Sequence, residues 1–527
     1  MRIFSLACAL VLTFVASAAE RPNIVLIMAD DMGFSDIGSY GGEIQTPNLD
    51  RLAKEGLRFT QFYNNAKCSP TRASLLTGLY SQQVGIHNGP EVMKNCVTLA
   101  EVLKASDYRT LMTGKWHALQ LPVERGFDRY YGLTDGCCNF WNPGDQREGE
   151  AAPVHKRYPR KWAIDDKVII PFTPKDPNFY TTDAFTTNAI DFLDEYQDEE
   201  NPFFLYVAYT APHYPLHAWP EDIAKYENLY MQGWDNIRKQ RHHRQLGMGI
   251  MNPEWGLAPR DPWTPKWSGV DDPDEWNVKG MTGGGQNKQT WENVGNKEEW
   301  AQRMAIYAAM VDRMDQNIGR LLEKLKATGK LENTLILFLS DNGGCAERVN
   351  LTPGNVTGGM DTYITVDPPW ANAQNTPFRK YKRYNHEGGI STPLIAWWPG
   401  RIEANTITHQ PGHIIDVMAT VLELSGADYP TQYNGQQVLP HQGLSLLPVF
   451  KGLKRKAHEY LFWEFGKAKA VRHGKWKLVK DGDSPWELYD LDVDRTELND
   501  VVNSHTDIAS GLEGQWLAWA KRSNVRL

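Results

Sequence analysis

The chain has 527 residues, of which 41% are hydrophobic and 23% are charged. This composition excludes a disordered chain and supplies enough apolar residues for a large core. There are 56 basic and 64 acidic residues, giving a formal net charge of −8. That balance is not typical of nucleic-acid-binding proteins, so we expect no nucleic-acid partner. A polyanion would have to bind in a local basic pocket.

The first nineteen residues predict a cleaved signal peptide. Arg2 is followed by an apolar run over residues 3–15 and by small residues at 16–19. This is the pattern of a secretory signal. The run is too short for a transmembrane span, and no later run is long enough. We therefore expect a secreted or periplasmic protein with no stable membrane span.

Five cysteines remain after the predicted cleavage site: Cys68, Cys96, Cys137, Cys138 and Cys345. An odd number in an exported protein indicates one thiol with chemistry of its own. We interpret the adjacent Cys137 and Cys138 as structural rather than metal-binding. Pairing among Cys96, Cys137, Cys138 and Cys345 stays open at this stage.

Apolar runs of strand length alternate with helical patterns over most of the chain. The predicted buried strands cover residues 23–29, 202–209, 334–339 and 394–398. One predicted helix begins after Thr46, a candidate N-cap. Two further predicted helices cover residues 298–325 and 416–425. Strands buried on both faces and alternating with helices predict a layered α/β domain.

Two later segments depart from this pattern. Residues 219–300 contain eight of the nineteen tryptophans with many prolines and glycines, and we interpret them as a long insertion over one face. Short strand-like runs at 460–489 and a helical run at 507–521 predict a small antiparallel α+β domain. The predicted divisions are a signal peptide at 1–19, a catalytic domain at 20–440 and a C-terminal domain at 441–527.

Oxygen-donor side chains follow two of the predicted strands. Asp30 and Asp31 come directly after the first strand, and Asp341 and Asn342 follow the strand at 334–339. In α/β sheets the carboxyl ends of strands carry the functional site. Carboxylate and amide oxygens suit a hard cation such as calcium or magnesium. The sequence therefore predicts a divalent-cation site at this edge.

A cysteine stands at the start of another predicted helix. Cys68 lies two residues before Pro70, a residue typical of a first helical turn, and Arg72 follows one turn later. A helix N-terminus lowers the pKa of a thiol and favours nearby anions. The guanidinium of Arg72 would add a forked donor for the same anion.

Residues 68–78 (CSPTRASLLTG) resemble the signature of the type I, formylglycine-dependent sulfatases, within the alkaline-phosphatase-like superfamily. Further stretches resemble this family in the expected order: residues 46–63, 114–117 (GKWH), 211–215 (APHYP), 339–344 (LSDNGG) and 378–389. The resemblance implies an α/β/α domain with a mostly parallel or mixed central sheet. It also implies a small C-terminal α+β domain with an antiparallel sheet.

The resemblance implies an enzyme that hydrolyses a sulfate ester. A maturation enzyme would oxidise Cys68 to formylglycine, the nucleophile in its hydrated form. One calcium ion, rather than magnesium, would be held by Asp30, Asp31, Asp341, Asn342 and residue 68. The substrate would be a sulfated small molecule or saccharide.

The resemblance also assigns roles to individual side chains. Asp341 is the candidate base for the attacking hydroxyl, and His117 would deprotonate the second hydroxyl so that sulfate leaves. His213, helped by Lys382, would protonate the leaving alcohol. Three cations would neutralise the transferred group: Arg72, Lys115 and Lys382. His217 and Trp219 follow the His213 motif, and both substrate contact and simple packing stay open for them.

Two alternative functions are compatible with parts of the sequence. One is a phosphomonoester or phosphonate ester hydrolase of the same superfamily, which would use additional Asp and His ligands for a second metal. The other is a non-catalytic protein that binds sulfated glycans, which would be expected to lose Cys68, Arg72 or a metal ligand. The position of the sulfate and endo or exo action stay open.

Overall fold

The computed structural model describes residues 21–151, 160–261, 263–264, 285–286 and 290–526. The predicted signal peptide therefore lies outside the described residues, as does part of the tryptophan-rich insertion. None of the described helices is both long and apolar enough to cross a membrane.

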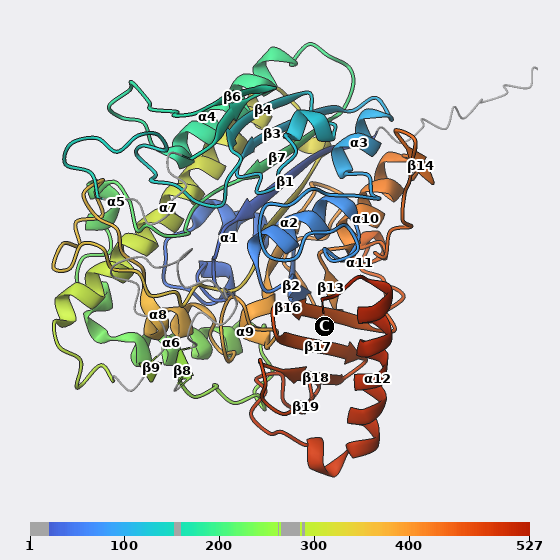
Figure 1. Ribbon diagram of the computed structural model, residues 1–527. Coiled ribbons are helices and arrows are strands. Elements are labelled where there is room, and N and C mark those ends of the chain that lie inside the picture. The colour runs from blue at the N-terminus through green and yellow to red at the C-terminus, as the bar shows by residue number, and fades with distance from the viewer. Residues whose placement is uncertain (1–20, 152–159, 262, 265–284, 287–289, 527) are drawn as a thin grey trace, which may run out of the picture.

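A mixed sheet forms the centre of the larger part of the molecule (Figure 1). It combines parallel pairs around β1 with antiparallel pairs toward both edges. In spatial order its strands are β12 (Thr406–Thr408), β2 (Leu57–Tyr63), β11 (Ser391–Trp397), β10 (Thr334–Ser340), β1 (Asn23–Ala29), β7 (Phe203–Ala208), β3 (Arg109–Gly114), β4 (Arg129–Leu133), β5 (Trp162–Ile164) and β6 (Lys167–Ile169), with β13 (Gly412–His413) also paired to β2.

Strand β1 is buried on both faces, as its continuous apolar run predicts. Its side chains alternate between two core clusters: Val25 and Ile27 face one, while Ile24 and Leu26 face the other. The first cluster lies under α1 (Pro47–Lys54), α4 (Thr181–Glu195) and α7 (Lys297–Ala327). The second lies under α2 (Cys68–Thr77), α3 (Leu99–Lys104) and α10 (Asp416–Ser425). Helices thus cover both faces of the sheet.

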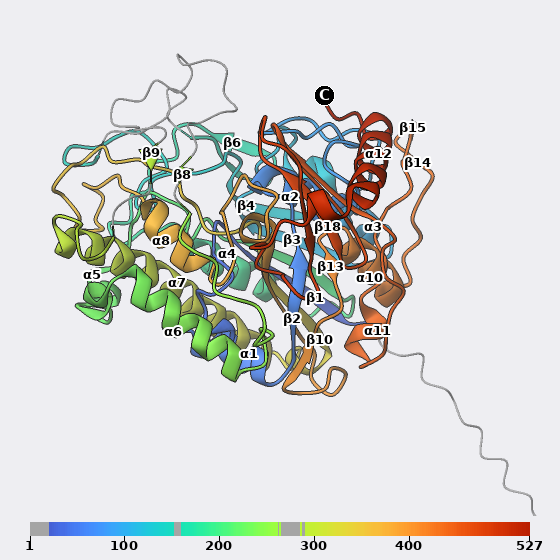
Figure 2. The same cartoon turned by 90° about the horizontal axis from the view of Figure 1, so that it is seen from below.

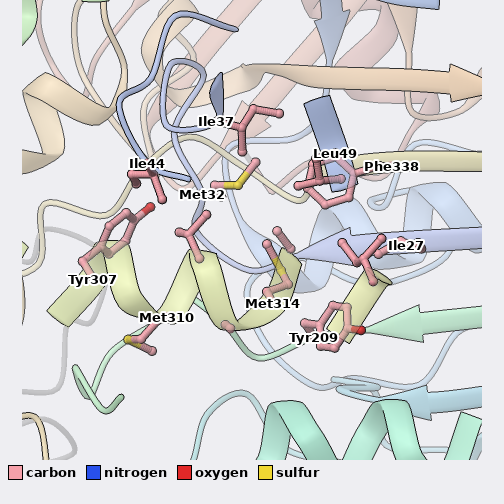
Figure 3. Packing of buried hydrophobic residues seen from close by; sticks show 14 of the residues in the cluster. Ile27, Met32, Ile37, Ile44, Leu49, Tyr209, Tyr307, Met310, Met314 and Phe338 are labelled. Carbon is pink, nitrogen blue, oxygen red and sulfur yellow. The ribbon is translucent and has the colours of Figure 1, made fainter. Parts of the chain in front are cut away.

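Helix α7 supplies much of the first cluster because its apolar residues recur at helical spacing. In Figure 3, Tyr307, Met310 and Met314 of this helix lie among the cluster side chains, with Ile27 of β1 and Phe338 of β10. Burial of such side chains contributes roughly 1.5–3 kcal/mol each.

A second, antiparallel sheet lies at one side of the molecule. It consists of β16 (Leu461–Phe465), β17 (Ala468–His473), β18 (Trp476–Lys480) and β19 (Glu487–Asp490). Helix α12 (Thr506–Arg522) packs along it in Figure 1, and Trp516 and Trp519 of this helix are fully buried. The predicted strands and helix of this region are confirmed, as is the predicted fold class.

The described part of the tryptophan-rich insertion is largely helical. It contains α5 (Pro220–Ala224) and α6 (Trp234–Gly247). In Figure 2 these helices lie with α8 (Asp367–Gln374) on the side of the molecule opposite α10 and α12. Trp234 is buried in a cluster of edge-on rings with Trp291, Trp300 and Trp370, so this tryptophan packs the fold.

One predicted helix cap is wrong. Thr46 makes no side-chain cap bond to α1, and its hydroxyl instead accepts a hydrogen bond from Gly38 N. The carboxylate of Asp315, on α7, accepts bonds from Asn48 N and Leu49 N. A cap supplied by tertiary contact satisfies the same orphan amides, and local sequence does not reveal it.

Candidate functional site

The carboxyl ends of β1, β3, β7 and β10 meet at one edge of the sheet because these four strands run parallel. Asp30 and Asp31 follow β1, Lys115 follows β3, and Asp341 and Asn342 follow β10. All five side chains are buried. Motifs separated by more than 300 residues along the chain therefore form one cluster.

Backbone and side-chain bonds lock the acidic residues together. Asp31 N donates to Asp341 Oδ1 at 3.1 Å, and Asn342 Nδ2 donates to Asp31 Oδ1 at 2.8 Å. Asp31 holds a left-handed backbone with φ 64°, a strained conformation for a non-glycine residue. That conformation is enforced by the surrounding bonds.

Each acid is matched by a buried cation. Lys115 Nζ lies 2.6 Å from Asp30 Oδ2, and Lys382 Nζ lies 2.7 Å from Asp31 Oδ2. Arg72 donates from Nη2 to Asp341 Oδ2 at 2.9 Å and from Nη1 to the carbonyl of Lys115 at 3.1 Å. These three cations are the ones that the sequence motifs single out.

Cys68 is the first residue of α2 and is 2% exposed. Its sulfur and one carboxylate oxygen each from Asp30 and Asp341 lie within 4.8 Å of one another. The helix N-terminus and Arg72 both favour negative charge at this point. The residue types and their positions suit an anion held against residue 68.

His213 and Lys382 form a pair at the same edge. His213 Nε2 lies 3.4 Å from Lys382 Nζ and 3.4 Å from Asp31 Oδ2. The opposite ring nitrogen, Nδ1, lies 2.6 Å from the carbonyl of Tyr214, which can only accept. Nδ1 therefore carries a proton, and Nε2 is the atom that gains or loses one. Burial lowers the pKa of His213 to about 3 in spite of Asp31.

His117 follows Lys115 and Trp116 and holds a left-handed backbone with φ 65°. Gly136 packs against its Nε2, where any added Cβ would come within 2.8 Å. Its Nδ1 is buried and has no hydrogen-bond partner among the described residues. Burial and then the charge of Lys115 hold the pKa of His117 well below its usual value. The ring is therefore neutral and can accept a proton.

The two neighbouring carboxyls of Asp31 and Asp341 have pKa values shifted in opposite directions. Burial acts to raise the pKa of Asp31, but Lys382, His213 and Lys115 outweigh it and hold that pKa well below its usual value. For Asp341, burial and the charge of Asp30 raise the pKa to about 7 in spite of Arg72. A cation bound by both Asp30 and Asp341 would relieve the repulsion that raises the pKa of Asp341.

The donor set fits a divalent cation. Asp30 Oδ1 and Asn342 Oδ1 are buried and accept no hydrogen bond from any described residue. Buried polar atoms are almost always partnered, so two such oxygens beside Cys68 indicate a ligand. All the candidate ligands apart from residue 68 supply oxygen, which calcium and magnesium prefer.

The site does not include every predicted residue. His217 is fully buried, and its ring accepts from Phe140 N at 3.4 Å through Nδ1 and lies 2.8 Å from the carbonyl of Thr362 through Nε2. Trp219 packs edge-on against Trp141 and donates to Asp183. Both side chains have packing partners, so neither enters the function proposed below.

Other residues reach the site without a sequence signal. Tyr206 Oη lies 3.4 Å from Arg72 Nη1, and Glu347 lies 3.9 Å from Lys382 Nζ. Tyr206 could have been noticed as a polar tip within a buried strand, whereas Glu347 lies on a loop. The described residues form no disulfide, and Cys96, Cys138 and Cys345 are buried thiols.

With this geometry in view, comparisons with known proteins are decisive. The sequence profile of the family described as Sulfatase matches residues 22–427. The chain belongs to the sulfatase family. A second profile, N-sulphoglucosamine sulphohydrolase C-terminal, matches residues 378–516 of this sulfatase.

Individual relatives agree over almost the whole sulfatase. It is 31% identical to an uncharacterised sulfatase of Schizosaccharomyces pombe, over 96% of this chain and 95% of the relative. It is 32% identical to an arylsulfatase of Klebsiella aerogenes, over 82% and 93%. The solved structure of Ps i-CgsB in complex with k-i-k-neocarrahexaose is 26% identical, with a TM-score of 0.68 over 96% and 94%. These similarities support a sulfuric ester hydrolase with an alkaline-phosphatase-like fold.

Proposed function

We propose that this sulfatase is an exported enzyme that hydrolyses a sulfate monoester of a carbohydrate, using a formylglycine made from Cys68 and one bound calcium ion. The observation that carries the proposal is the convergence of three buried cations and three buried acids on residue 68. Such an arrangement suits a tetrahedral anion beside a hard cation.

The cation would be held by Asp30, Asp31, Asp341, Asn342 and residue 68. When present, the ion polarises sulfate oxygens and the formylglycine supplies two geminal hydroxyls, which a serine could not offer. We propose calcium rather than magnesium because four protein side chains converge here, whereas magnesium usually retains several waters.

The protein's own cations would bind and orient the sulfate group. Arg72 offers a forked donor at the first turn of α2, and Lys115 and Lys382 approach from the ends of other elements. Because these groups are buried, their attraction for an anion is screened less than at a surface. They would also stabilise charge as the sulfur–oxygen bond breaks.

His213 would protonate the departing oxygen. Its Nδ1 proton is engaged by the carbonyl of Tyr214, so Nε2 is the atom that donates, and Lys382 lies within reach to supply it. His117 would take a proton from the side chain of residue 68 to complete the cycle. Asp341 would accept the proton of the attacking hydroxyl.

A carbohydrate substrate is supported by one solved relative. Ps i-CgsB was solved with k-i-k-neocarrahexaose and shares 26% identity with this chain. The apolar run and small residues of the first nineteen positions support export.

A phosphate or phosphonate ester is the second candidate. Among the described residues, both groups that could hold a metal include Asp30, so no separate second metal cluster favours it. The test is turnover of 4-nitrophenyl sulfate beside 4-nitrophenyl phosphate by the matured enzyme. A large preference for the sulfate is expected, and a preference for the phosphate would contradict the proposal.

A further inference from the structure

Glu347 places a carboxylate between two lysines beside the candidate site. Its Oε1 lies 3.8 Å from Lys67 Nζ and 3.9 Å from Lys382 Nζ. These separations allow charge attraction but exceed hydrogen-bond length. Lys67 directly precedes Cys68 in the chain, so both lysines belong to the surroundings of the reacting group.

The two oxygens of Glu347 are treated differently. Tyr214 Oη donates to Oε2 at 2.5 Å, which fixes the carboxylate. Glu347 is 7% exposed, and its Oε1 is buried and accepts no hydrogen bond from the described residues. Burial acts to raise the pKa of Glu347, but Lys382 and Lys67 outweigh it and lower that pKa to about 2. An ionised acceptor without a donor indicates a ligand group.

This acceptor lies on the leaving-group side of the site. Lys382 Nζ is 3.4 Å from His213 Nε2, the atom proposed to protonate the departing oxygen. Glu347 Oε1 lies 3.9 Å from the same Nζ, and Glu347 is also hydrogen-bonded to Tyr214, the residue next to His213. The carbon that carries the ester oxygen, and the substituents next to it, would therefore approach Glu347 and Lys67.

We propose that Glu347 and Lys67 bind a free hydroxyl on the carbon next to the sulfated carbon of a sugar. The hydroxyl would donate to Glu347 Oε1 and accept from Lys67 Nζ, using both of its hydrogen-bonding capacities. This inference rests on the proposed function and deepens it, because it makes Glu347 a specificity-determining residue. A hydrogen atom or a second anion at that carbon would satisfy only one partner or neither.

The test compares substrates rather than overall activity. The probes are 4-nitrophenyl sulfate and methyl glycosides of galactose and N-acetylgalactosamine, each with one sulfate at one position. For the glycoside cleaved fastest by the wild type, each analogue that lacks one free hydroxyl on a carbon next to the sulfated carbon is added. Fastest cleavage of a 6-sulfate, whose neighbouring carbon has no hydroxyl, would contradict the inference. The variants are Glu347→Ala and the volume-conserving Glu347→Gln, with formylglycine content measured in each.

Glu347→Ala is expected to lower kcat/KM for the sugar sulfate about 10- to 100-fold, the effect of losing a hydrogen bond to a charged group. The loss on 4-nitrophenyl sulfate, which has no hydroxyl, should be at least tenfold smaller. One deoxy analogue should cost the wild type a similar factor and cost Glu347→Ala nothing further, because both changes remove the same contact. Glu347→Gln should fall between the two enzymes.

Tyr214→Phe tests how the Glu347 carboxylate is positioned, and Glu464→Gln, at a buried acid on β16, is the matched control with an unchanged ratio of sugar to aryl activity. Tyr214→Phe removes the donor to Oε2 but keeps the ring that packs on His213 at 4.4 Å. Its ratio of sugar to aryl activity should fall part of the way towards that of Glu347→Ala, because the carboxylate loses the bond that fixes it.

Equal losses of Glu347→Ala on sugar and aryl sulfates, or full additivity with every deoxy change, would overturn the inference and leave Glu347 as a support for Lys382. A wild type that cleaves 4-nitrophenyl sulfate but none of the glycosides would overturn it while sparing ester hydrolysis. A fully matured wild type that cleaves no sulfate ester would contradict the proposed function itself.

Discussion

Two buried clusters of charge in this sulfatase are built from similar residues but are completed differently. At the strand ends, three acids face three cations, and Asp30 Oδ1 and Asn342 Oδ1 remain without a donor among the described residues. Between the large domain and the C-terminal sheet, Glu387 and Glu497 face Lys477 and Arg495, all fully buried.

In the second cluster each carboxylate oxygen has a cation or an N–H donor within 3.1 Å, although Glu497 Oε1 meets its cation without hydrogen-bond geometry. Lys477 Nζ lies 2.8 Å from Glu387 Oε1 and 2.8 Å from Glu497 Oε1. Glu387 Oε2 lies 3.1 Å from Arg495 Nε, and Glu497 Oε2 accepts from Glu387 N at 2.9 Å. Burial of charge therefore does not itself mark a site. The clusters differ in distance: an ammonium lies 2.8 Å from Glu497 Oε1, whereas the guanidinium of Arg72 lies 3.8 Å from Asp30 Oδ1 and leaves that oxygen open to a ligand.

The largest expected effect comes from the cluster at the strand ends, which contains Asp30, Asp31 and Asp341. Asp30→Asn keeps the shape of a proposed ligand but removes its charge. It should lower kcat/KM for 4-nitrophenyl sulfate about 10³-fold or more, since a catalytic cation contributes several kcal/mol. Chelation should inactivate the wild type, and added calcium should restore it. Activity that survives both Asp30→Asn and chelation would contradict a catalytic role for the cation.

Breaking the second cluster, around Lys477, should lower the stability of the fold instead of the activity. Lys477→Met leaves Glu387 and Glu497 without their shared ammonium, and uncompensated buried charge costs about 3–5 kcal/mol. The midpoint of urea unfolding should fall accordingly, while kcat/KM of the folded enzyme changes less than about threefold. A large loss of kcat/KM at unchanged stability would show that this cluster takes part in the reaction.

A change at His213 should separate protonation of the leaving oxygen from neutralisation of the sulfate charge at the strand ends. General acids matter most when the departing oxygen is basic, so His213→Ala should slow a sugar sulfate about 10²-fold and 4-nitrophenyl sulfate much less. Lys115→Ala removes charge neutralisation and should harm both substrates by similar factors. Equal losses for His213→Ala would mean that His213 binds the sulfate group.

The smallest expected effect concerns a buried acid that forms no ion pair within the described part of the chain. Glu464, on β16, accepts from Gln82 Nε2 at 2.9 Å, and burial raises its pKa to about 7. The folded protein therefore binds the proton more tightly than the unfolded chain, and stability falls as pH rises from about 4.5 to 7. Glu464→Gln should be about 3 kcal/mol more stable than wild type at pH 8 and similar at pH 4. A pH-independent difference would contradict this assignment.

Much of the fold was predictable because apolar runs are unambiguous. The runs at Asn23–Ala29 and Thr334–Ser340 are the observed β1 and β10, and the acids after them meet as predicted. Strand β3 (Arg109–Gly114) escaped prediction because its sequence RTLMTG has no apolar run or clean alternation. Its position is fixed by pairing with β7 and β4.

The candidate site was predictable where motifs lie at strand ends, and not elsewhere. Lys382 and Glu347 both lie on irregular segments, and only the resemblance pointed to Lys382. Nothing in the sequence near Glu347 shows that its carboxylate lies between Lys67 and Lys382. His217 lies in a motif, yet the sequence could not show that it packs in the core, because its backbone partner Thr362 is 145 residues away.

The central claim is that a formylglycine at position 68 carries the reaction. The most direct test prepares the enzyme with graded amounts of a maturation enzyme and measures two quantities on each sample. Peptide mass spectrometry gives the fraction of chains in which Cys68 is converted to aldehyde, and 4-nitrophenyl sulfate turnover gives kcat per total chain. A straight line through the origin is expected, with no activity for Cys68→Ala. Undiminished turnover by a sample with an intact Cys68 thiol in every chain would contradict it.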